Sequence, residues 1–412
     1  MKVAEINIFP YGSTGKIMLQ IAETVRAHGG EAETFTPIRF SRIEKRANPQ
    51  EIKNHQYFGS WTENCIHYYL GSILGANGCF SFQGTKELLR YLDEFQPDII
   101  HLHNLHEFCI NLPMLFGYIK KNNIRVVWTL HDCWAFTGHC PYFGLVGCEK
   151  WKTECNHCPQ PRVYPKMYLD TSKWMFHKKE KWFCGISNMT IVTPSQWLAD
   201  LVAQSFLKKY PTKVINNGID LSVFQPTQSN FREKYHIAND KFLLLGVAFD
   251  WGIRKGMDVF ITLAKRLDQR YQIVLVGTNE MIDQQLPSNI ISIHRTKNQK
   301  ELAEIYTAAD LFVNPTREEN YPTVNMEAIA CGTPVLAFRT GGSPEILDET
   351  CGAVVGCNDI ENMEEEIHRI CREKPYSEEQ CLKKAQSFDM ALKYEEYIRL
   401  YEDCTYSAES NL

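Results

Sequence analysis

Two glutamates stand eight residues apart where a strand, a loop and a helix are predicted to meet. Residues 311–314 form the apolar run of a buried parallel strand, and residues 323–330 have helical periodicity that begins just after Pro322. Ligands of open α/β sheets bind at such junctions, and the free N–H groups of a helix start favour an anion. An ionised carboxylate can only accept hydrogen bonds, so Glu319 suits the hydroxyls of a sugar and Glu327 suits both hydroxyls of a ribose.

This segment resembles the Glu-x7-Glu signature of the retaining GT-B glycosyltransferases of family 4. A plain alternative is that the glutamates merely favour the dipole at a helix start. Two further runs, Cys331 to Val335 and Gly341 to Glu345, follow in the order and spacing of the family. The resemblance covers most of the 412 residues and implies an α/β protein with two Rossmann-like domains that face each other across a cleft.

Length and composition bound the class of protein. With 412 residues and 44% hydrophobic content, the chain fits two domains of about 200 residues each. The net charge of −5 gives no general attraction to nucleic acid, which we do not expect as a partner. Fifteen cysteines spread over both halves, with no leader before the first strand, favour reduced thiols in a cytoplasm. No apolar run approaches the roughly 20 residues that span a bilayer, so we expect a cytoplasmic protein, soluble or peripheral to the inner face of the membrane.

Strand and helix alternate in two successive series. The first series predicts strands at 2–9, 31–36, 98–103, 125–130 and 190–193, with helices at 15–28, 85–94, 111–121 and 196–206. The second series predicts strands at 241–247, 272–276, 290–293, 310–314, 334–337 and 352–355, with a long helix at 255–270. We therefore expect two Rossmann-like domains, at 1–212 and 213–388. The resemblance implies that the first binds the acceptor and the second the nucleotide sugar, and that a last helix at 389–412 crosses back to the first.

A glycine-containing loop, residues 11–16, lies between the first strand and the first helix. Glycine there lets the backbone approach a pyrophosphate or an acceptor closely. The loop lacks the residues of a Walker A motif, and the chain has no Gly-x-Gly pair, which argues against a P-loop and against a dinucleotide-binding enzyme. We assign Gly15 to the donor side, and Gly12 and Ser13 to the acceptor side.

The chain also lacks an Asp-x-Asp pair, through which a metal-dependent transferase would bind its sugar nucleotide. The charge of the pyrophosphate must then be met by side chains and helix ends, and we expect no cofactor to be required for catalysis. Arg254 and Lys255 are the candidates. Alone they would be two solvated cations, but in the family an Arg and then Lys-Gly hold the two phosphates at this place. The family usually has an Arg soon after the glycine at 246, which this chain lacks, so Arg254 would substitute for it.

The resemblance thus implies a donor site made mainly by the second domain. Its members are Gly15, Arg254, Lys255, Glu319, Asn320, Tyr321, Pro322, Thr323 and Glu327. The residues that it implies for catalysis are His131, Arg254, Lys255 and Glu319.

His131 follows a predicted buried strand, where a lone histidine is most often structural. It resembles the active-site histidine of the family, which lies beside the transferred sugar and the phosphate. The run from Thr129 to Cys140 resembles a branch of the family involved in exopolysaccharide and capsule assembly. Asp132, on the acceptor side, is expected to fix the tautomer of His131, whereas His103 either lines the acceptor side or is structural.

Four cysteines, Cys140, Cys148, Cys155 and Cys158, lie in one long polar loop. Four thiolates that include a Cys-x2-Cys pair would hold a structural Zn²⁺ tetrahedrally, although the other spacings are irregular. Free buried thiols are the alternative. Residues 162–183 are basic and aromatic, as in a helix that docks on an anionic membrane surface and equally as in an ordinary helix with its aromatic residues in the core.

Together these features predict a retaining hexosyltransferase that moves a sugar from a UDP- or GDP-sugar to a glycan or lipid-linked glycan in surface polysaccharide synthesis. No protein nucleophile is evident, so the resemblance implies that the acceptor hydroxyl attacks on the face from which the diphosphate departs, and that the leaving phosphate takes the proton. Two rivals stay open, a GT-B sugar-nucleotide epimerase and a glycan-binding or assembly scaffold without catalysis. The set of Lys255, Glu319, Glu327 and His131 argues against the scaffold.

Overall fold

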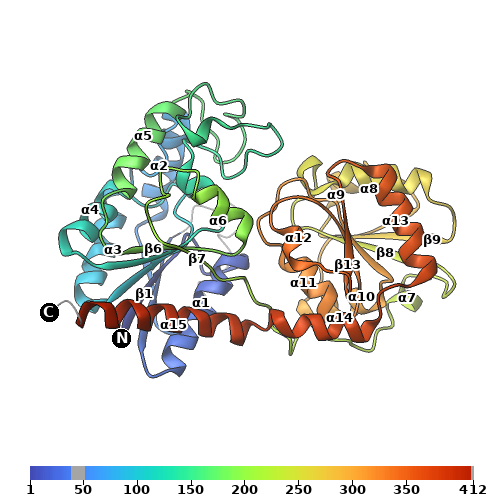
Figure 1. The fold of residues 1–412 in the computed structure, drawn as a ribbon. Coiled ribbons are helices and arrows are strands. Elements are labelled where there is room, and N and C mark those ends of the chain that lie inside the picture. Colours follow the sequence, from blue (N-terminus) through green and yellow to red (C-terminus); the bar gives the residue numbers. More distant parts are fainter. Residues whose placement is uncertain (39–51, 410–412) are drawn as a thin grey trace. The chain divides into compact units, whose positions relative to one another are not determined.

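The protein consists of two compact units, each with its own sheet (Figure 1). The computed structural model describes residues 1–38 and 52–409, and the side chains of the last helix up to residue 403. Unit 1 contains Met1–Ile215 and Tyr394–Leu412, and unit 2 contains Asn216–Lys393. Unit 1 is therefore discontinuous in sequence, because its second segment follows unit 2 along the chain.

Unit 1 is built on a parallel seven-stranded sheet with the order β3-β2-β1-β4-β5-β6-β7. Its strands are β1 (Lys2–Ile6), β2 (Glu31–Pro37), β3 (His55–Phe58), β4 (Ile99–Leu102), β5 (Arg125–Thr129), β6 (Met189–Thr193) and β7 (Thr212–Val214). Its helices are α1 (Gly12–Ala27), α2 (Trp61–Leu74), α3 (Phe82–Phe95), α4 (Leu112–Asn122), α5 (Ser172–Phe183), α6 (Gln196–Val202) and most of α15 (Met390–Glu409), with 3₁₀ turns η2 (Trp134–Phe136) and η3 (Lys150–Lys152). The strand order reverses between β1 and β4, which is where ligands of such sheets bind.

Unit 2 is built on a parallel six-stranded sheet with the order β10-β9-β8-β11-β12-β13. Its strands are β8 (Phe242–Val247), β9 (Tyr271–Val276), β10 (Ile290–Ile293), β11 (Leu311–Asn314), β12 (Val335–Phe338) and β13 (Gly352–Val355). Its helices are α7 (Phe231–Lys234), α8 (Met257–Arg266), α9 (Glu280–Asp283), α10 (Gln299–Ala308), α11 (Thr323–Ala330), α12 (Ser343–Ile346), α13 (Ile360–Glu373) and α14 (Glu378–Ala385), with 3₁₀ turns η4 (Ile253–Lys255) and η5 (Gln386–Phe388). The order reverses here between β8 and β11.

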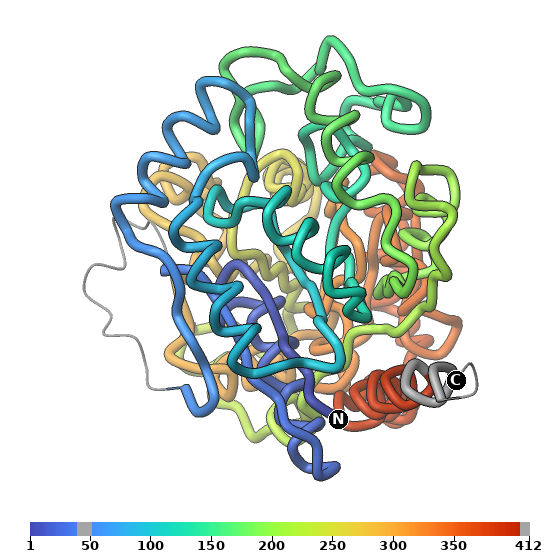
Figure 2. The backbone as a smooth tube through the Cα atoms, turned by 90° about the vertical axis from the view of Figure 1, so that its left-hand side faces the viewer, coloured from blue at the N-terminus to red at the C-terminus, as the bar shows by residue number. Residues whose placement is uncertain are grey.

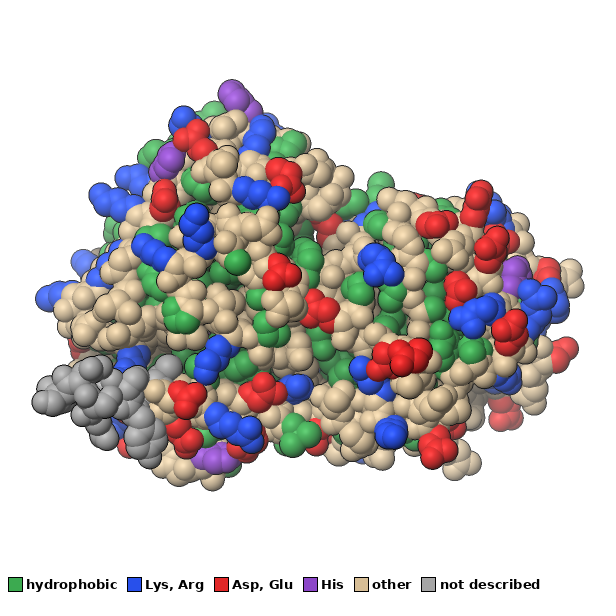
Figure 3. Space-filling view, viewed as in Figure 1, with side chains coloured by type: hydrophobic (Ala, Val, Ile, Leu, Met, Phe, Trp, Pro, Cys, Tyr) green, Lys and Arg blue, Asp and Glu red, His purple; other side chains and the backbone are tan. Residues whose placement is uncertain are grey.

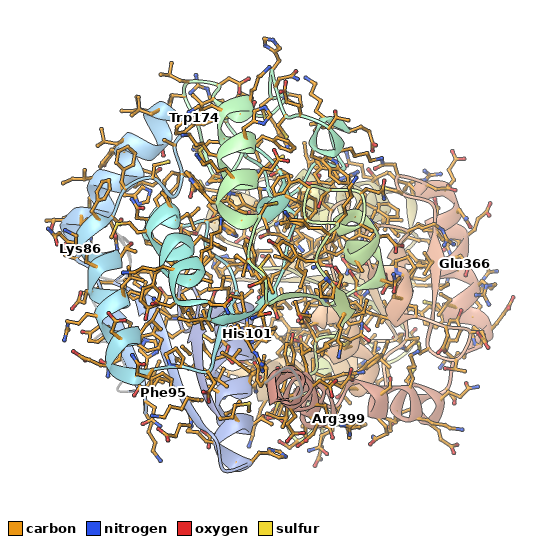
Figure 4. The ribbon with its side chains drawn as sticks, turned by 60° about the vertical axis from the view of Figure 1, so that its left-hand side comes forward. Lys86, Phe95, His101, Trp174, Glu366 and Arg399 are labelled. Atoms are coloured by element: carbon orange, nitrogen blue, oxygen red, sulfur yellow. The ribbon has the colours of Figure 1, made fainter. Side chains whose placement is uncertain are left out.

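The central strands of both sheets are apolar runs without alternation, as expected where helices cover both faces. Residues 311–313 of β11, for example, are completely or almost completely buried. In unit 1 two of these strands also bury an ionisable residue, Glu5 in β1 and His101 in β4. Figure 4 shows His101 in the interior of unit 1. These exceptions to an apolar core lead to the candidate site.

Several predicted elements have different ends in the structure. The first strand ends at Ile6 rather than at residue 9, and α6 ends at Val202 rather than at residue 206. The helix predicted at 255–270 begins only at Met257, because a 3₁₀ turn closed by Gly256 precedes it, and it ends at Arg266.

Two corrections concern the outer part of unit 1. The basic, aromatic helix predicted at 162–183 is confined to α5, and residues 162–171 form a loop. β3 and α2 were not predicted, and α2 has a half-exposed apolar face that is described below. Within residues 1–38 and 52–409, no helix is both long and apolar enough to cross a bilayer.

The last helix, α15, packs on the sheet of unit 1 through two tyrosines. The Tyr401 hydroxyl lies 3.2 Å from Glu5 Oε1 and 2.6 Å from His101 Nδ1. The Tyr397 hydroxyl lies 3.1 Å from Thr129 Oγ1. Figure 2 shows this helix beside the N-terminus. Residues near the two ends of the sequence thus share one buried polar cluster.

Candidate active site

Lys255 and Glu319 form an ion pair at the carboxyl end of the unit 2 sheet. Lys255 Nζ lies 2.5 Å from Glu319 Oε2, and the two side chains are 19% and 16% exposed. The pair sits at the reversal point, because β8 leads into the turn of Lys255 and its neighbour β11 leads into the loop of Glu319. Burial would raise the pKa of Glu319, but the charge and hydrogen bond of Lys255 and the charge of Arg254 lower it. Glu319 is therefore an ionised acceptor at neutral pH.

Two contacts hold the turn before α8 against the loop after β11. Gly256 has a φ of +75°, and a Cβ there would lie 2.4 Å from the Pro315 carbonyl oxygen, so a larger residue would push the turn away. Arg317 donates two hydrogen bonds of 2.7 Å to the Asp258 carboxylate. The backbone N–H of Arg317 also donates to the Arg254 carbonyl at 2.9 Å. The ion pair is thus held by backbone geometry as well as by its own charges.

A glycine turn holds the same loop from the other side. A Cβ on Gly341, whose φ is +54°, would lie 1.7 Å from the Glu319 carbonyl oxygen. The N–H of Gly342 donates to the Asn320 carbonyl at 2.7 Å. Asn320 and Tyr321 are both buried. The Gly-Gly run noted in the sequence therefore fixes the backbone that presents Glu319.

The helix α11 begins beside this loop with Pro322 at its N-cap position. No side chain caps this end, so the first N–H groups, from Thr323 onward, suit an anion. Glu327 is half-buried one turn into the helix, and the Tyr306 hydroxyl donates to its Oε2 at 3.1 Å. Burial raises the pKa of Tyr306 far above its usual value, so the tyrosine stays a donor that orients the carboxylate.

Arg254 completes the unit 2 group. Its Nη1 lies 3.4 Å from the Glu318 carbonyl oxygen, across the same loop. The structure therefore brings together Arg254, Lys255 and Glu319, and places Glu327 on the adjoining helix.

In unit 1, His131 ends a buried chain of hydrogen bonds that begins at Glu5. His131 Nε2 lies 3.1 Å from His103 Nδ1, and His103 Nε2 lies 2.8 Å from Glu5 Oε2. On the other side of the carboxylate, His101 Nδ1 lies 3.1 Å from Glu5 Oε1, and its Nε2 lies 2.8 Å from Thr129 Oγ1. Glu5 and His101 face each other in register on the paired strands β1 and β4.

Burial and mutual charge set the protonation of this chain. Burial would raise the pKa of Glu5, but His101 and His103 lower it to about 2. Burial and the neighbouring His101 lower the pKa of His103 to about 4, although Glu5 opposes them. Burial and the neighbouring histidines also lower the pKa of His131 well below its usual value. At neutral pH, Glu5 is therefore ionised, and His103 and His131 are neutral.

These charges determine the tautomer of His131. The Glu5 carboxylate can only accept, so His103 donates through Nε2–H and its Nδ1 must accept. His131 then donates through Nε2–H and carries its lone pair on Nδ1. Its Nδ1 is thus the acceptor of the ring, suited to a hydroxyl proton.

Asp132 does not fix this tautomer, contrary to our expectation. Its Oδ2 lies 3.0 Å from His106 Nε2, and the other ring nitrogen of His106 lies 2.8 Å from the Tyr164 hydroxyl. His103 instead occupies the position next to His131, with the two rings stacked at 5.4 Å between centroids. The reason is that β4 and β5 are adjacent, so the residues that follow them meet at one edge.

The remaining predicted residues of unit 1 lie at the start of α1, whose first turn contains Gly12, Ser13 and Gly15. Asn7 connects this turn to the segment after β4, because its Nδ2 donates to Thr14 Oγ1 at 3.3 Å and its Oδ1 accepts from the Asn104 N–H at 3.2 Å. The helix start and the histidines therefore share one edge of the sheet.

Sequence reasoning missed Glu5, His101 and Tyr401. A glutamate inside the apolar run of the first strand and a His-x-His pair at the end of another buried strand were the available signals. Pairing those two strands would have placed the carboxylate beside the histidines. The tyrosines of α15 had no such signal, because a helical period does not indicate which sheet the helix contacts.

The four loop cysteines, Cys140, Cys148, Cys155 and Cys158, line one small cavity in unit 1.

Comparisons with known proteins agree with this architecture. The putative colanic acid biosynthesis glycosyl transferase WcaC of Escherichia coli K12 is 26% identical over 289 residues, which are 68% of this chain and 69% of that protein. Sucrose-phosphate synthase from Thermosynechococcus elongatus superposes with a TM-score of 0.72 at 18% identity and covers 98% of this chain and 99% of its own. Anabaena Alr3699/HepE in complex with UDP superposes with a TM-score of 0.68 at 15% identity and covers 98% and 100%. At these identities the solved structures show the fold, which is GT-B.

Two family profiles together match nearly the whole chain. The profile of the group 1 glycosyl transferases matches residues 227–388, which include Lys255, Glu319 and Glu327. The profile of Glycosyltransferase Family 4 matches residues 15–223, half of the chain, which include His103 and His131. The chain therefore belongs to glycosyltransferase family 4.

Proposed function

We propose that this glycosyltransferase is a retaining hexosyltransferase that uses a UDP- or GDP-sugar and acts on a glycan or lipid-linked glycan in surface polysaccharide synthesis. The observation that carries the proposal is the Lys255–Glu319 pair beside the uncapped start of α11. A cation for a departing diphosphate and an acceptor for sugar hydroxyls are there in direct contact. The nucleotide-sugar donor is supported by the UDP bound to HepE, and the polysaccharide role by the name of WcaC.

In the proposed reaction, donor binding replaces the Lys255–Glu319 contact by two contacts with the ligand. Lys255 and Arg254 turn to the phosphate oxygens, and Glu319 accepts hydrogen bonds from the sugar hydroxyls. The bond between the anomeric carbon and the diphosphate breaks, and the acceptor oxygen bonds to that carbon on the same face. The acceptor proton passes to the leaving phosphate. The two cations stabilise the charge that develops on the phosphate, and no cofactor takes part.

Two further residues are proposed to orient the donor. Glu327, held by Tyr306, accepts hydrogen bonds from both hydroxyls of the ribose. His131 accepts a hydrogen bond from a hydroxyl of the sugar or acceptor through Nδ1, because its other nitrogen is committed to His103.

Product analysis with a panel of UDP- and GDP-sugars tests the reaction. Glycosyl transfer, or slow release of free sugar without an acceptor, supports the proposal. A new sugar isomer would identify an epimerase, and binding without turnover would identify a scaffold. The activity should persist in EDTA, and immediate loss with recovery by Mg²⁺ or Mn²⁺ would contradict the role given to Lys255 and Arg254.

The two glutamates should affect different steps. Glu327→Ala should weaken the binding of the free nucleoside diphosphate, whereas Glu319→Ala should mainly lower turnover. Calorimetric titration and initial rates measure the two effects, with the exposed Glu361→Ala of α13 as control. Equal affinity in the wild type and in Glu327→Ala would contradict the ribose assignment.

A half-exposed apolar patch supports a peripheral membrane contact of unit 1. On α2 the patch consists of Ile66, Tyr69, Leu70, Ile73 and Leu74, which are spaced three or four residues apart and are 40–58% exposed. The loop before α5 continues it, because the N–H groups of Tyr168 and Leu169 donate to the Ser72 and Ile73 carbonyls. Monomeric proteins seldom expose so many large apolar side chains together.

The charge beside this patch suits an anionic bilayer. Lys166 is exposed in the same loop, and Lys178 of α5 lies over the ring of Trp174, which is 44% exposed. Figure 4 shows Trp174 on the outer side of α5, and Figure 3 shows lysine and arginine side chains beside hydrophobic ones along the left-hand edge of unit 1. Apolar side chains that enter the headgroup region and ammonium groups that meet anionic lipid bind such surfaces together.

Vesicle flotation tests the membrane contact. The wild type should float with vesicles of phosphatidylcholine and phosphatidylglycerol, and less with phosphatidylcholine alone. The double variant Leu70→Glu, Ile73→Glu should remain in the dense fraction. Met281→Glu, which changes a 72% exposed apolar residue of unit 2, should float as the wild type does. Equal behaviour of the double variant and the wild type would reject the patch, and would leave the reaction proposed above unaffected.

A further inference from the structure

The loop between η2 and α5, residues 137–171, brings four cysteines to one place. It contains little regular structure besides the short turn η3, and loops of this length are uncommon without some fixed anchor. Cys140, Cys148, Cys155 and Cys158 all line a single cavity of about 20 Å³. A cavity of that size admits one water or one small ion and excludes an organic ligand.

The surroundings of these cysteines match those of a metal-bound thiolate. The N–H of Gly138 donates to Cys155 Sγ at 3.2 Å. Such contacts from outside the ligand shell orient the ligands of a metal site. The residue at 138 cannot be larger, because a Cβ there would lie 2.2 Å from the Ser172 carbonyl oxygen and 2.8 Å from Cys155 Cβ. The backbone of the loop is therefore packed directly on the sulfur that it contacts.

Two lysines beside the cavity supply positive charge. Lys179 is completely buried, and its Nζ donates to the Trp134 carbonyl at 2.7 Å and to the Thr137 carbonyl at 3.0 Å. Among the described residues, no carboxylate forms an ion pair with it within 4.0 Å. Lys150 lines the cavity itself and donates to the Asn156 and His157 carbonyls. A buried ammonium without a counter-charge is unfavourable, whereas a zinc ion with four thiolates carries two negative charges that would favour the charged form of Lys179. Lys150 is exposed to solvent.

We propose that Cys140, Cys148, Cys155 and Cys158 bind one structural Zn²⁺ that closes this loop. Zinc takes four cysteine sulfurs tetrahedrally at about 2.3 Å, which places the sulfurs about 3.8 Å apart. In the described structure no three of the four lie within 4.8 Å of one another, so the loop must tighten around the ion. The binding energy of such a site adds directly to the stability of the folded loop.

The buried Glu5, His101 and His103 are not a second such site. Their ligand atoms do lie within 4.8 Å of one another, but each is hydrogen-bonded within the chain that ends at His131. Their charges are thus satisfied without an ion.

Elemental analysis of protein produced without a histidine tag, in zinc-supplemented medium and under reducing conditions, tests the proposal. One zinc per chain is expected. The double variant Cys155→Ser, Cys158→Ser should lose the zinc, whereas Cys65→Ser, Cys184→Ser, which changes two half-buried thiols of unit 1 outside the cavity, should retain it. Full zinc in the first variant would reject these ligands.

A second measurement uses only the wild type, in case the variant does not fold. A mercurial that modifies thiols should release one zinc to a chromophoric chelator, and replacement by Co²⁺ should give the charge-transfer and visible bands of tetrahedral cobalt thiolate. Protein with four free thiols and no zinc, or with a disulfide between Cys155 and Cys158, would overturn the proposal.

Discussion

The two units hold their ionisable groups in different ways. In unit 1, Glu5, His101 and His103 are almost completely buried, and both histidine rings are hydrogen-bonded to the carboxylate. The ring proton of each histidine is therefore held at one nitrogen. In unit 2, Lys255 and Glu319 keep some exposure, and each can exchange its partner for a ligand. The first arrangement is suited to holding one state of His131. In the proposed reaction, the second would change state when a donor binds.

The largest expected effect tests the unit 2 half of this comparison. Lys255→Ala should lower kcat/KM by about 100-fold or more, because it removes a preorganised charge at the leaving phosphate. It should lower thermal stability less than Glu5→Gln does, since the pair is 16–19% exposed and water can reach Glu319 in place of the lysine. Steady-state rates and a melting curve measure both, with the exposed Lys265→Ala of α8 as control. A large loss of stability with unchanged activity would mean that the Lys255–Glu319 pair holds the fold and does not act in the reaction.

The matching change in unit 1 should mainly affect stability. Glu5→Gln removes the negative charge of the carboxylate that His101 and His103 contact. Breaking a buried pair in this way lowers the free energy of unfolding by about 3 kcal/mol. Chemical denaturation measures the free energy of unfolding, and Glu33→Gln in the neighbouring strand β2 is the control. Activity should fall as well, because His131 would lose its fixed tautomer. A variant as stable as the wild type would show that the buried chain is not needed to hold unit 1 together.

Acid should lower the folding stability of unit 1 before that of unit 2. The pKa values of His55 and His103 are lowered to about 4, and that of His67 to about 3, each because burial disfavours the charged form. The unfolded state then binds protons that the folded state does not, so stability is full above pH 6.5 and falls as the pH drops toward 4. For His103 alone the loss approaches about 3 kcal/mol. All three histidines lie in unit 1.

Hydrogen exchange at several pH values measures this separation. Amides of the strands in unit 1 should lose protection between pH 6.5 and 4, before those of unit 2. Earlier loss in unit 2, or simultaneous loss in both, would contradict the assignment of acid sensitivity to these histidines.

The smallest effect concerns the contact of α15. Tyr401→Phe removes one hydroxyl from the cluster and should lower the stability of unit 1 by about 1 kcal/mol, because Glu5 and His101 still bond to each other. Tyr168→Phe, at an exposed tyrosine, should change nothing. An effect as large as that of Glu5→Gln would mean that the helix, rather than the carboxylate, organises the cluster.

The same contrast explains what the sequence could predict. The spacing of residues within short segments was enough to identify Lys255, Glu319 and Glu327 as site residues. Both the strand–loop–helix context and the family resemblance depend on that spacing. The buried chain that ends at His131 takes its members from separate strands, and Tyr401 joins it 300 residues after His101. Only the folded sheet and the docked helix bring these residues together. Asp132 was therefore chosen for a role that His103 fills. The helix α2 was missed because its apolar face is exposed rather than directed to a core.

The docking of α15 on β1 has a consequence for synthesis in the cell. The first 215 residues of unit 1 leave the ribosome before any of unit 2, yet the tyrosines that bond Glu5, His101 and Thr129 come only after residue 393. At translation rates of about 5–20 residues per second, the interval lasts roughly 10–35 s. During it, the sheet of unit 1 has its polar centre uncovered along one side. Of the two units, the one that is made first is thus completed last, and it is the one for which a chaperone has time to act.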